Sequence, residues 1–434
     1  MNQLINKLES RDALISIIGL GYVGLPLALS FLRKGYSVLG LDIDLTKLKK
    51  IREGKSYIEH IDLKQIPNLI EEEKFYCSSD FSAVSEADAV IFCLPTPLDK
   101  NREPDLSFVM DSLNKIAPHL KGNQVLSLES TTYPGTTEEL LRPLLESQGW
   151  TVGKNIFLVY SPEREDPGNE EFENDTIPKL CSGVTEECLE VGISLYSQII
   201  DKVIPVSSTK VAEMAKILEN TYRAVNIALI NELKVVADKM DIDIYEVVNA
   251  AASKPFGFKP FYPGPGVGGH CIPIDPFYLT WKAKEFGINT KFIELAGEVN
   301  NSMVGFTVSK VKLALNSLDK DFHNSKILVL GLSYKKNIDD LRESPALEIL
   351  SSLKNLGSKV DYSDPHIPVL PELRQYNFNL KSIEVSEETL KAYDCVLITT
   401  DHDKFAWEDI KNNSKTIVDT RGVYNPVEGK IFRA

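Results

Sequence analysis

The sequence predicts an α/β protein with two doubly wound, mostly parallel sheets joined by a central region that contains a long helix. Three observations carry this prediction. Strand-like apolar runs alternate with helical patterns through 14–160, and the same alternation starts again at Lys326. Between them, 208–240 is a helical pattern without glycine or proline. We therefore expect three domains, at 1–205, 206–320 and 321–434.

Composition limits the classes of function. The chain has 434 residues and a formal net charge of −14, which argues against nucleic acid or an anionic membrane as its main partner. Six cysteines without CxxC pairs indicate a reducing cytoplasm and no zinc or other metal site. The apolar stretch 13–32 has the length of a membrane span, but three glycines and a proline interrupt it and a polar segment precedes it.

The first apolar run leads into a glycine pattern typical of dinucleotide-binding turns, Gly19-Leu-Gly21-Tyr-Val-Gly24. The first glycine permits the tight turn, the second lets the backbone approach a pyrophosphate, and the third lets the helix pack on the strand. The next strand ends in Asp42, which suits the ribose hydroxyls of NAD and would repel the 2′-phosphate of NADP. An ordinary glycine-rich turn is the alternative. The pattern predicts a Rossmann-like NAD site made by Gly19, Gly21, Tyr22, Val23, Gly24 and Asp42.

Polar turns follow the next three strand-like runs, at the edge of a parallel sheet where ligands bind. We expect Thr96 and Thr131 on the cofactor side. Glu163 and Arg164 are expected on the substrate side. Each of these residues could instead be a capping or turn residue.

The long helical pattern carries Lys216 and Asn220, which are four residues apart and therefore on one face. Taken alone, Lys216 would more often be a solvated lysine. A long helix after a complete sheet domain favours a connecting spine or a dimer surface, and a second helical region is expected from Tyr278 to about Leu318.

The segment 261–275 contains four glycines and three prolines, so we expect a shaped loop rather than a regular helix or a central strand. The loop carries Cys271 and, four residues later, Asp275. A thiol on a rigid glycine-rich loop suggests a covalent nucleophile, and a buried structural thiol is the alternative.

The second alternation of strands and helices lacks the GxGxxG pattern. Its strand-end segments instead offer four cations that suit a diphosphate in an otherwise acidic chain: Lys335, Lys336, Arg342 and Arg421. A solvated surface lysine is the alternative for Lys336.

An NAD site, a cationic second unit and a thiol between them in the sequence predict a particular chemistry. Hydride transfer alone needs no thiol. A thiolate becomes useful when an aldehyde is oxidised further, because it adds to the carbonyl, the hemithioacetal loses a second hydride, and water cleaves the thioester. We therefore expect oxidation of an alcohol to an acid in two NAD-dependent steps.

Together these motifs resemble the UDP-glucose/GDP-mannose dehydrogenase family over essentially the whole chain. The matching positions are Gly19-x-Gly21-x-x-Gly24, Ser130-Thr131, Pro162-Glu163, Lys216-x-x-x-Asn220, Gly268-Gly269-x-Cys271-x-x-x-Asp275, Lys335 and Arg421. The resemblance implies an N-terminal NAD domain, a central helical region that forms a homodimer, and a C-terminal domain that binds a UDP-sugar.

The resemblance also implies roles for individual residues. Cys271 would be the nucleophile, and Lys216 would stabilise the developing oxyanion. Asn220 and Asp275 would position or activate water, with help from Thr131 and Glu163. The substrate-binding residues that it implies are Glu163, Arg164, Lys216, Asn220, Phe261, Gly268, Lys335, Arg342 and Arg421.

Within the family, 161–164, 254–258 and 261–266 resemble the bacterial members that oxidise UDP-N-acetylglucosamine. Pro255 stands where members acting on UDP-glucose have an arginine that reaches the neighbouring subunit's sugar, and Lys254 or Lys259 could replace that cation. We expect four-electron oxidation of the C6 hydroxyl of UDP-N-acetylglucosamine to the uronic acid, for surface polysaccharides such as capsule or O-antigen. UDP-glucose, UDP-N-acetylgalactosamine and UDP-N-acetylmannosamine are the alternative substrates. A two-electron dehydrogenase or epimerase with a structural Cys271 would also fit the motifs, as would a nucleotide-sugar sensor without turnover.

Overall fold

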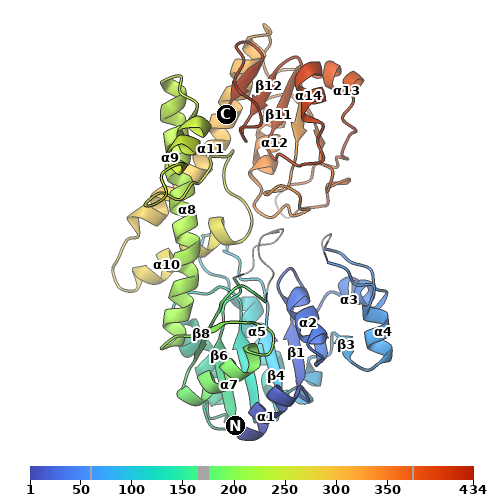
Figure 1. The fold of residues 1–434 in the computed structure, drawn as a ribbon, viewed down its shortest axis with the longest axis vertical. Helices are drawn as coiled ribbons and strands as arrows, with labels where there is room; N and C mark the ends of the chain where they lie inside the picture. Colours follow the sequence, from blue (N-terminus) through green and yellow to red (C-terminus); the bar gives the residue numbers. More distant parts are fainter. Residues whose placement is uncertain (59–60, 165–174, 374–375) are drawn as a thin grey trace. The chain divides into compact units, whose positions relative to one another are not determined.

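The computed structural model describes residues 1–58, 61–164, 175–373 and 376–434, which form two compact units. The N-terminal unit comprises Met1–Glu219 and Phe277–Asn289, and the C-terminal unit comprises Asn220–Pro276 and Thr290–Ala434. Each unit contains a doubly wound sheet, and a helix of 31 residues occupies the middle of the chain (Figure 1). The predicted fold class is therefore confirmed, whereas the division into three domains stays a prediction.

The N-terminal unit is built on an eight-stranded sheet with the order β3-β2-β1-β4-β5-β6-β7-β8. All neighbouring strands are parallel except β6 and β7. The strand order reverses between β1 and β4, and in such sheets the crevice at the reversal binds ligands. The strands are β1 (Leu14–Ile18), β2 (Ser37–Leu41), β3 (Phe75–Ser78), β4 (Ala89–Phe92), β5 (Gln124–Leu128), β6 (Ile156–Tyr160), β7 (Lys179–Gly183) and β8 (Val203–Pro205).

The strands β4 to β6 are buried along their whole length, as expected when both faces of a parallel sheet are covered. One continuous apolar core joins the sheet to its helices. The helices are α1 (Asn2–Ser10), α2 (Gly24–Arg33), α3 (Leu45–Arg52), α4 (Ile66–Glu71), α5 (Ser107–Ile116), α6 (Arg142–Ser147) and α7 (Glu186–Tyr196), with the short turns η1 (Phe81–Ser85), η2 (Ala117–His119) and η3 (Thr137–Leu141).

The C-terminal unit contains a five-stranded parallel sheet with the order β10-β9-β11-β12-β13. The order reverses between β9 and β11, so a second ligand-binding edge is available there. The strands are β9 (Lys326–Leu330), β10 (Lys359–Ser363), β11 (Cys395–Ile398), β12 (Ile417–Asp419) and β13 (Ile431–Arg433). The helices that lie wholly in this unit are α9 (Ile244–Ala252), α11 (Lys291–Asn316), α12 (Pro345–Asn355), α13 (Glu387–Ala392) and α14 (Trp407–Asn413).

The long helix α8 (Thr209–Lys239) buries polar as well as apolar side chains and exposes a large apolar face. Its buried face carries polar and charged side chains, each at most 7% exposed: Glu213, Lys216, Asn220, Asn231 and Lys234. Its other face exposes large apolar side chains, each at least 41% accessible: Val211, Met214, Leu218, Tyr222, Leu229, Leu233 and Val236. The apolar pattern that predicts the helix therefore marks an exposed face and not the core.

The region predicted to be helical from Tyr278 to about Leu318 is helical, but it consists of two helices. These are α10 (Cys271–Lys284) and α11, separated by a turn in which Gly287 has a φ of 69°. The expectation that Cys271 and Asp275 stand on a loop was wrong, because α10 begins at Cys271. Pro273 is compatible with this start, since the N–H groups of a first helical turn have no acceptor within the helix.

The stretch 13–32 forms β1, the glycine turn and α2. Across the described parts of the chain, no helix has the length and apolar character needed to cross a membrane.

Candidate active site

The three glycines of the first turn have different surroundings, and these fit a bound dinucleotide. A Cβ on Gly19, whose φ is 92°, would lie 2.4 Å from the carbonyl oxygen of Cys93. A Cβ on Gly24 would lie 1.8 Å from the carbonyl oxygen of Gly19. Around Gly21, by contrast, nothing lies within 4 Å of such a Cβ. Two glycines are therefore required by the turn itself, and the middle one borders open space in front of the N-terminus of α2, where a pyrophosphate fits.

Asp42 supports this turn from the end of β2. Its Oδ2 accepts the N–H of Leu20 at 2.9 Å, and its Oδ1 accepts the N–H of Asp44 at 2.9 Å. The Tyr57 hydroxyl donates to the carbonyl oxygen of Leu20, so both polar groups of that residue are held. Each carboxylate oxygen can accept more than one hydrogen bond, so the ribose contact predicted for Asp42 remains compatible with these bonds.

Ser130 connects the two turns that carry the predicted threonines. Its hydroxyl donates to the carbonyl oxygen of Leu94 at 2.7 Å and accepts the Leu94 N–H at 3.0 Å. The turn after β4, with Thr96 2% exposed, is thereby tied to the turn after β5, with Thr131 half-buried. Both side chains lie at the carboxyl ends of strands in the N-terminal unit, as predicted.

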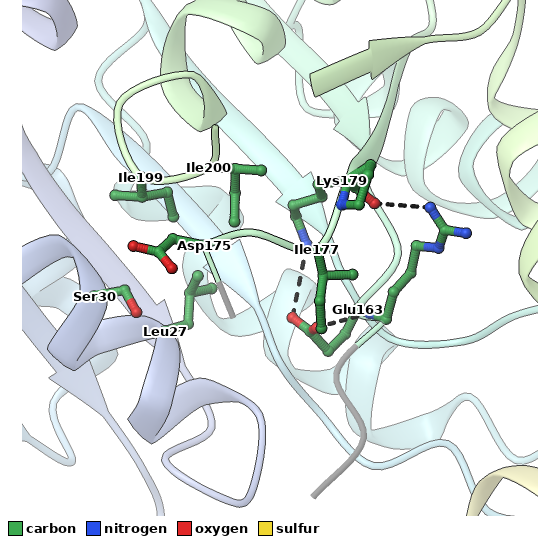
Figure 2. A pocket seen from close by; sticks show the side chains of 10 residues that line it. Leu27, Ser30, Glu163, Asp175, Ile177, Lys179, Ile199 and Ile200 are labelled. Atoms are coloured by element: carbon green, nitrogen blue, oxygen red, sulfur yellow. Dashed lines mark hydrogen bonds and ion pairs between the residues drawn. The ribbon is translucent and has the colours of Figure 1, made fainter. Parts of the chain in front are cut away.

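Glu163 lies beside an ion pair that the sequence reasoning missed. The Lys179 ammonium is 2.6 Å from Glu129 Oε2. It is also 3.7 Å from Glu163 Oε2 (Figure 2). Burial alone would lower the pKa of Lys179, but the two carboxylates outweigh it and raise that pKa. The lysine therefore stays charged and orients Glu163. Glu129 directly precedes Ser130-Thr131 and could have been found from that position, whereas nothing local to the sequence marks Lys179.

Arg164 is engaged by protein groups. Its guanidinium is 2.7 Å from Glu219 Oε1 and donates to the carbonyl oxygen of Pro178 at 2.7 Å. Glu219 stands on α8 between Lys216 and Asn220, so this ion pair ties the turn after β6 to the helix. The substrate-binding role of Arg164 stays a prediction.

Asp275 and Asn220 form the hydrogen-bonded centre of the predicted catalytic set. Asp275 is fully buried, and its Oδ2 accepts the side-chain N–H of Asn220 at 2.6 Å. Its Oδ1 is 3.8 Å from Nδ1 of His270, a neighbour of Cys271 that the sequence reasoning did not single out. Because Asp275 is one turn along α10 from the half-buried Cys271, the carboxylate and the thiol share a helix face.

The helix start also affects the thiol. The N-terminal turn of a helix carries partial positive charge, and a thiolate placed there is stabilised.

Lys216 lies one turn before Asn220 on the same buried face of α8, and the boundary between the two compact units falls between them.

The glycine-rich loop that precedes Cys271 packs closely against the C-terminal sheet's turns. A Cβ on Gly264 would lie 3.0 Å from Nη1 of Arg421, and one on Gly268 would lie 2.6 Å from Cβ of Tyr334. The N–H of Gly269 donates to the carbonyl oxygen of Arg342 at 2.8 Å. The glycines therefore allow the loop itself to approach neighbouring protein groups closely, at least in part, and not only a ligand. Phe261, at the other end of the loop, packs edge-on against Tyr222, with ring centres 5.7 Å apart.

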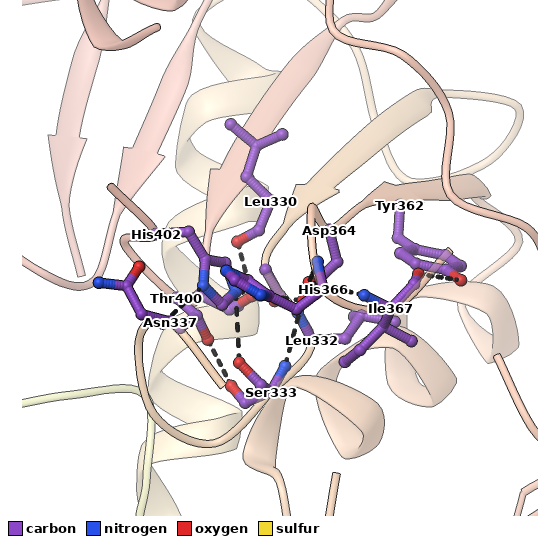
Figure 3. A network of polar contacts seen from close by, with 12 residues as sticks. Leu330, Leu332, Ser333, Asn337, Tyr362, Asp364, His366, Ile367, Thr400 and His402 are labelled. Carbon is purple, nitrogen blue, oxygen red and sulfur yellow. Dashed lines mark hydrogen bonds and ion pairs between the residues drawn. The ribbon is translucent and has the colours of Figure 1, made fainter. Parts of the chain in front are cut away.

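A buried polar network fixes the turn after β9, where Lys335 stands (Figure 3). Nδ1 of His402 accepts the N–H of Asn337 at 2.9 Å, so its Nε2 carries the proton and donates to Asp364, 3.2 Å away. Asp364 also accepts the N–H of Leu332 at 2.7 Å. Burial opposes the charge of Asp364, but the bonds from His402 and the backbone together lower its pKa.

Three of the four predicted cations of this unit have different kinds of partner. Lys336 is 2.7 Å from Asp403, and Arg342 is 2.6 Å from Asp340. Nε of Arg421 donates to the carbonyl oxygen of Thr399, at the end of β11, at 2.7 Å. Arg421 is thus held at the sheet edge by a neutral group, which leaves its positive charge for an anion. The ligand contacts predicted for all four residues stay predictions.

The first glycine turn and the C-terminal sheet edge define a class of protein. An NAD-binding sheet domain, a second doubly wound domain with cations at its edge, and a thiol at a helix start are the parts of a nicotinamide-dependent oxidoreductase. Comparison of the sequence with family models identifies the family within this class. The NAD binding domain of the UDP-glucose/GDP-mannose dehydrogenase family matches residues 13–200, its central domain 210–302 and its UDP binding domain 328–426. The chain belongs to this family, and its cofactor is NAD.

Individual relatives cover nearly the whole chain. Protein CapL of Staphylococcus aureus is 36% identical over 421 residues, which are 95% of this chain and 97% of CapL. A UDP-N-acetyl-D-glucosamine 6-dehydrogenase of Pseudomonas aeruginosa is 35% identical over 397 residues, 91% of this chain and 92% of that protein.

Solved structures agree with these matches. The UDP-D-ManNAc dehydrogenase of Pyrococcus horikoshii superposes with a TM-score of 0.85 at 31% identity, covering 97% of this chain and 98% of that one. The UDP-N-acetyl-mannosamine dehydrogenase Cap5O of Staphylococcus aureus gives a TM-score of 0.83 at 32% identity, with the same coverage. Relatives with two different N-acetylated substrates are therefore about equally similar to this chain.

Proposed function

We propose that this protein oxidises the C6 hydroxyl of UDP-N-acetylglucosamine to the uronic acid and consumes two NAD per substrate. The observation that carries the proposal is Cys271 at the start of α10, one turn from the buried Asp275–Asn220 pair. A thiol in this setting suits covalent capture of an aldehyde, which an alcohol dehydrogenase that stops at the aldehyde does not need.

Each of the predicted catalytic residues has a separate role in the proposed reaction. The Gly19–Gly24 turn would hold NAD, which would supply the hydride acceptor for both oxidations. Lys216 stabilises the alkoxide of the substrate and later the oxyanion of the adduct. The Cys271 thiolate adds to the aldehyde carbonyl, and oxidation of that adduct leaves a thioester. Asp275, oriented by Asn220, takes a proton from the water that cleaves the thioester and releases the thiolate and the acid.

The remaining residues hold the substrate and the cofactor. Glu163 and Thr131 assist at the reacting end, with Glu163 oriented by Lys179. Arg421 and Lys335 bind the diphosphate. Because the reaction needs Cys271 as a thiolate and the sequence has six cysteines without CxxC pairs, we place the enzyme in the reducing cytoplasm.

The choice among UDP-sugars rests on the loop before Cys271 and on the relatives. Pro255 in place of an arginine favours an N-acetylated sugar over UDP-glucose, and the exposed rings of Phe256 and Phe258 offer apolar contact for an acetyl group. UDP-N-acetylmannosamine, the C2 epimer, is the second candidate because the substrate named for two similar solved structures is that sugar. The product would serve synthesis of a surface polysaccharide such as a capsule.

A panel of UDP-sugars tests the assignment. We expect formation of two NADH per UDP-N-acetylglucosamine, with the uronic acid identified by mass spectrometry. Slower turnover of the C2 epimer is expected, because one reversed substituent in a shaped pocket costs about 1–3 kcal/mol. Fast turnover of UDP-glucose without turnover of any N-acetylated sugar would contradict the substrate, and one NADH per sugar would contradict the four-electron reaction.

We further propose that α8 forms a homodimer interface. Its exposed apolar face, from Val211 to Val236, is a patch that a solvated monomer rarely carries, and pairing with the same face of a second copy would bury it.

Replacement of Leu229 and Leu233 by glutamate should convert the dimer to a monomer. Both side chains are more than 40% exposed in the single chain, and two buried charges at an interface should weaken dimerisation at least about 100-fold. Light scattering after size-exclusion chromatography measures the change. Glu232→Gln on the same helix is the control and should stay dimeric, and a double variant that stays dimeric would exclude this face.

A further inference from the structure

A buried lysine on α8 holds the loop that leads to Cys271, and the reaction described above gives it no role. Lys234 is 2% exposed, and its ammonium donates to the carbonyl oxygen of Gly264 at 2.8 Å. Asn231, one turn earlier, accepts the N–H of Gly264 at 3.0 Å and donates to Asn300 at 2.9 Å. Both polar groups of Gly264 are therefore held by α8.

The same glycine lies next to the proposed diphosphate site. A Cβ on Gly264 would lie 3.0 Å from Nη1 of Arg421, so no side chain separates the loop from that guanidinium. Lys234 on one side and Arg421 on the other thus place two cations around one residue of the loop. Two cations in a buried place repel each other unless an anion joins them.

The charged groups that face Lys234 come from three elements. Arg421 follows β12, Lys310 stands on α11, and Asp238 stands on α8 itself. Asp238 already pairs with Lys310, and the ring of Phe306 covers the Lys234 ammonium at 5.1 Å. Burial, followed by the charge of Arg421, lowers the pKa of Lys234 to about 7 despite the opposing charge of Asp238. Near neutral pH the side chain can therefore gain or lose its proton.

We propose that Lys234 is a positioning residue that couples binding of the substrate's diphosphate at Arg421 to fixation of the loop before Cys271. The proposal rests on the diphosphate assignment of Arg421. An anion bound there offsets the charge of the guanidinium and so favours the ammonium form of Lys234. The ammonium binds the Gly264 carbonyl oxygen more strongly than the neutral amine does, because a charge-assisted hydrogen bond is the stronger one. A bound diphosphate thereby firms the loop that leads into α10.

The proposed coupling makes proton uptake on substrate binding depend on pH. Below pH 7 Lys234 is charged in both the free and the bound protein, so binding takes up no proton there. Above pH 7 a growing share of the free protein has lost this proton and the bound anion favours its return, so each binding event takes up a fraction of a proton. Affinity for the UDP-sugar should then fall with rising pH by up to about tenfold per pH unit.

Calorimetry without NAD measures this proton directly. Each UDP-sugar of the panel is titrated into the full-length protein at pH 8 in buffers of different ionisation enthalpy. We expect uptake of a measurable fraction of a proton in the wild type. We expect none in Lys234→Arg, which stays charged, and none in Lys234→Met, which has no proton to gain. Lys282→Met is the matched control, because that buried lysine pairs with Glu139 and Glu285 and should keep wild-type uptake.

The two variants also separate positioning from simple support of the fold. Lys234→Arg still donates to Gly264 and should keep most of kcat with a flatter pH profile. Lys234→Met should lower kcat while melting near the wild-type temperature. If Lys234→Arg does not fold, the comparison of Lys234→Met with the wild type still decides.

The outcomes distinguish this inference from the proposed function. Proton uptake equal in the wild type and in Lys234→Met would overturn the inference even if uronic acid forms normally. Binding with uptake that depends on Lys234, but without oxidation of any sugar, would support the inference and overturn the function. Failure of every UDP-sugar to bind would overturn both.

Discussion

Replacement of Cys271 by serine should stop the reaction after the first oxidation and lower uronic acid formation at least about 1,000-fold. A serine hydroxyl at this position remains protonated at neutral pH, so the covalent adduct with the aldehyde does not form at a useful rate. Residues that bind substrate and cofactor are unchanged, so the variant should still bind a UDP-sugar. The first hydride transfer should remain visible as at most one NADH per active site.

The measurement is a single-turnover trace of NADH absorbance with product analysis by mass spectrometry. Cys77→Ser is the matched control, because Cys77 lies on β3 in the N-terminal unit, 9% exposed, and has no proposed role. That control should keep two NADH per sugar. Uronic acid formed by Cys271→Ser at the wild-type rate would show that the thiol is structural.

The parts of the fold that could be predicted are those whose cause is local in the sequence. The first glycine turn is one example, because two of its three glycines, Gly19 and Gly24, are required by backbone that lies within or beside the turn. Asp42 is another, since its position at the end of β2 follows from the strand pattern. The start of α10 was missed for the opposite reason. Glycine and proline density argued for a loop up to Asp275, and the pattern could not reveal that Pro273 stands in a first helical turn, where it is tolerated.

Groups that depend on distant partners could not be predicted. Lys179 is a strand residue whose charge matters only because Glu129, which directly follows β5, lies 2.6 Å away. Lys234 has a helical spacing that is ordinary for a solvated face, yet it is buried against Gly264.

The faces of α8 show the same limit. Periodicity predicts a helix, but which of its faces is buried depends on what packs against it. Here polar groups are buried beside apolar side chains such as Ile217 and Ile230, since they find partners in the loop before Cys271 and in the turn 135–137. A sequence pattern shows the helical period, but it does not show which part of the chain packs against each face of the helix.

Alanine at Gly24 and alanine at Gly21 should damage the protein in different ways. The methyl group of Gly24→Ala would lie 1.8 Å from the carbonyl oxygen of Gly19 and 3.1 Å from Cβ of Cys93. The turn must open to admit it, which should cost about 3 kcal/mol or more of the free energy of unfolding. Thermal or urea unfolding without cofactor measures this loss.

Gly21→Ala should leave that free energy nearly unchanged and weaken NAD binding on the order of 100-fold. Its φ lies outside the left-handed region, and nothing lies within 4 Å of the added methyl group, so the folded chain accepts it. The methyl group would instead occupy the space through which the backbone approaches the pyrophosphate. Titration of NAD and an unfolding curve on the same preparation separate the two effects. Normal NAD affinity in Gly21→Ala would mean that the pyrophosphate does not lie against this glycine, whereas loss of stability would mean that the open space belongs to the fold.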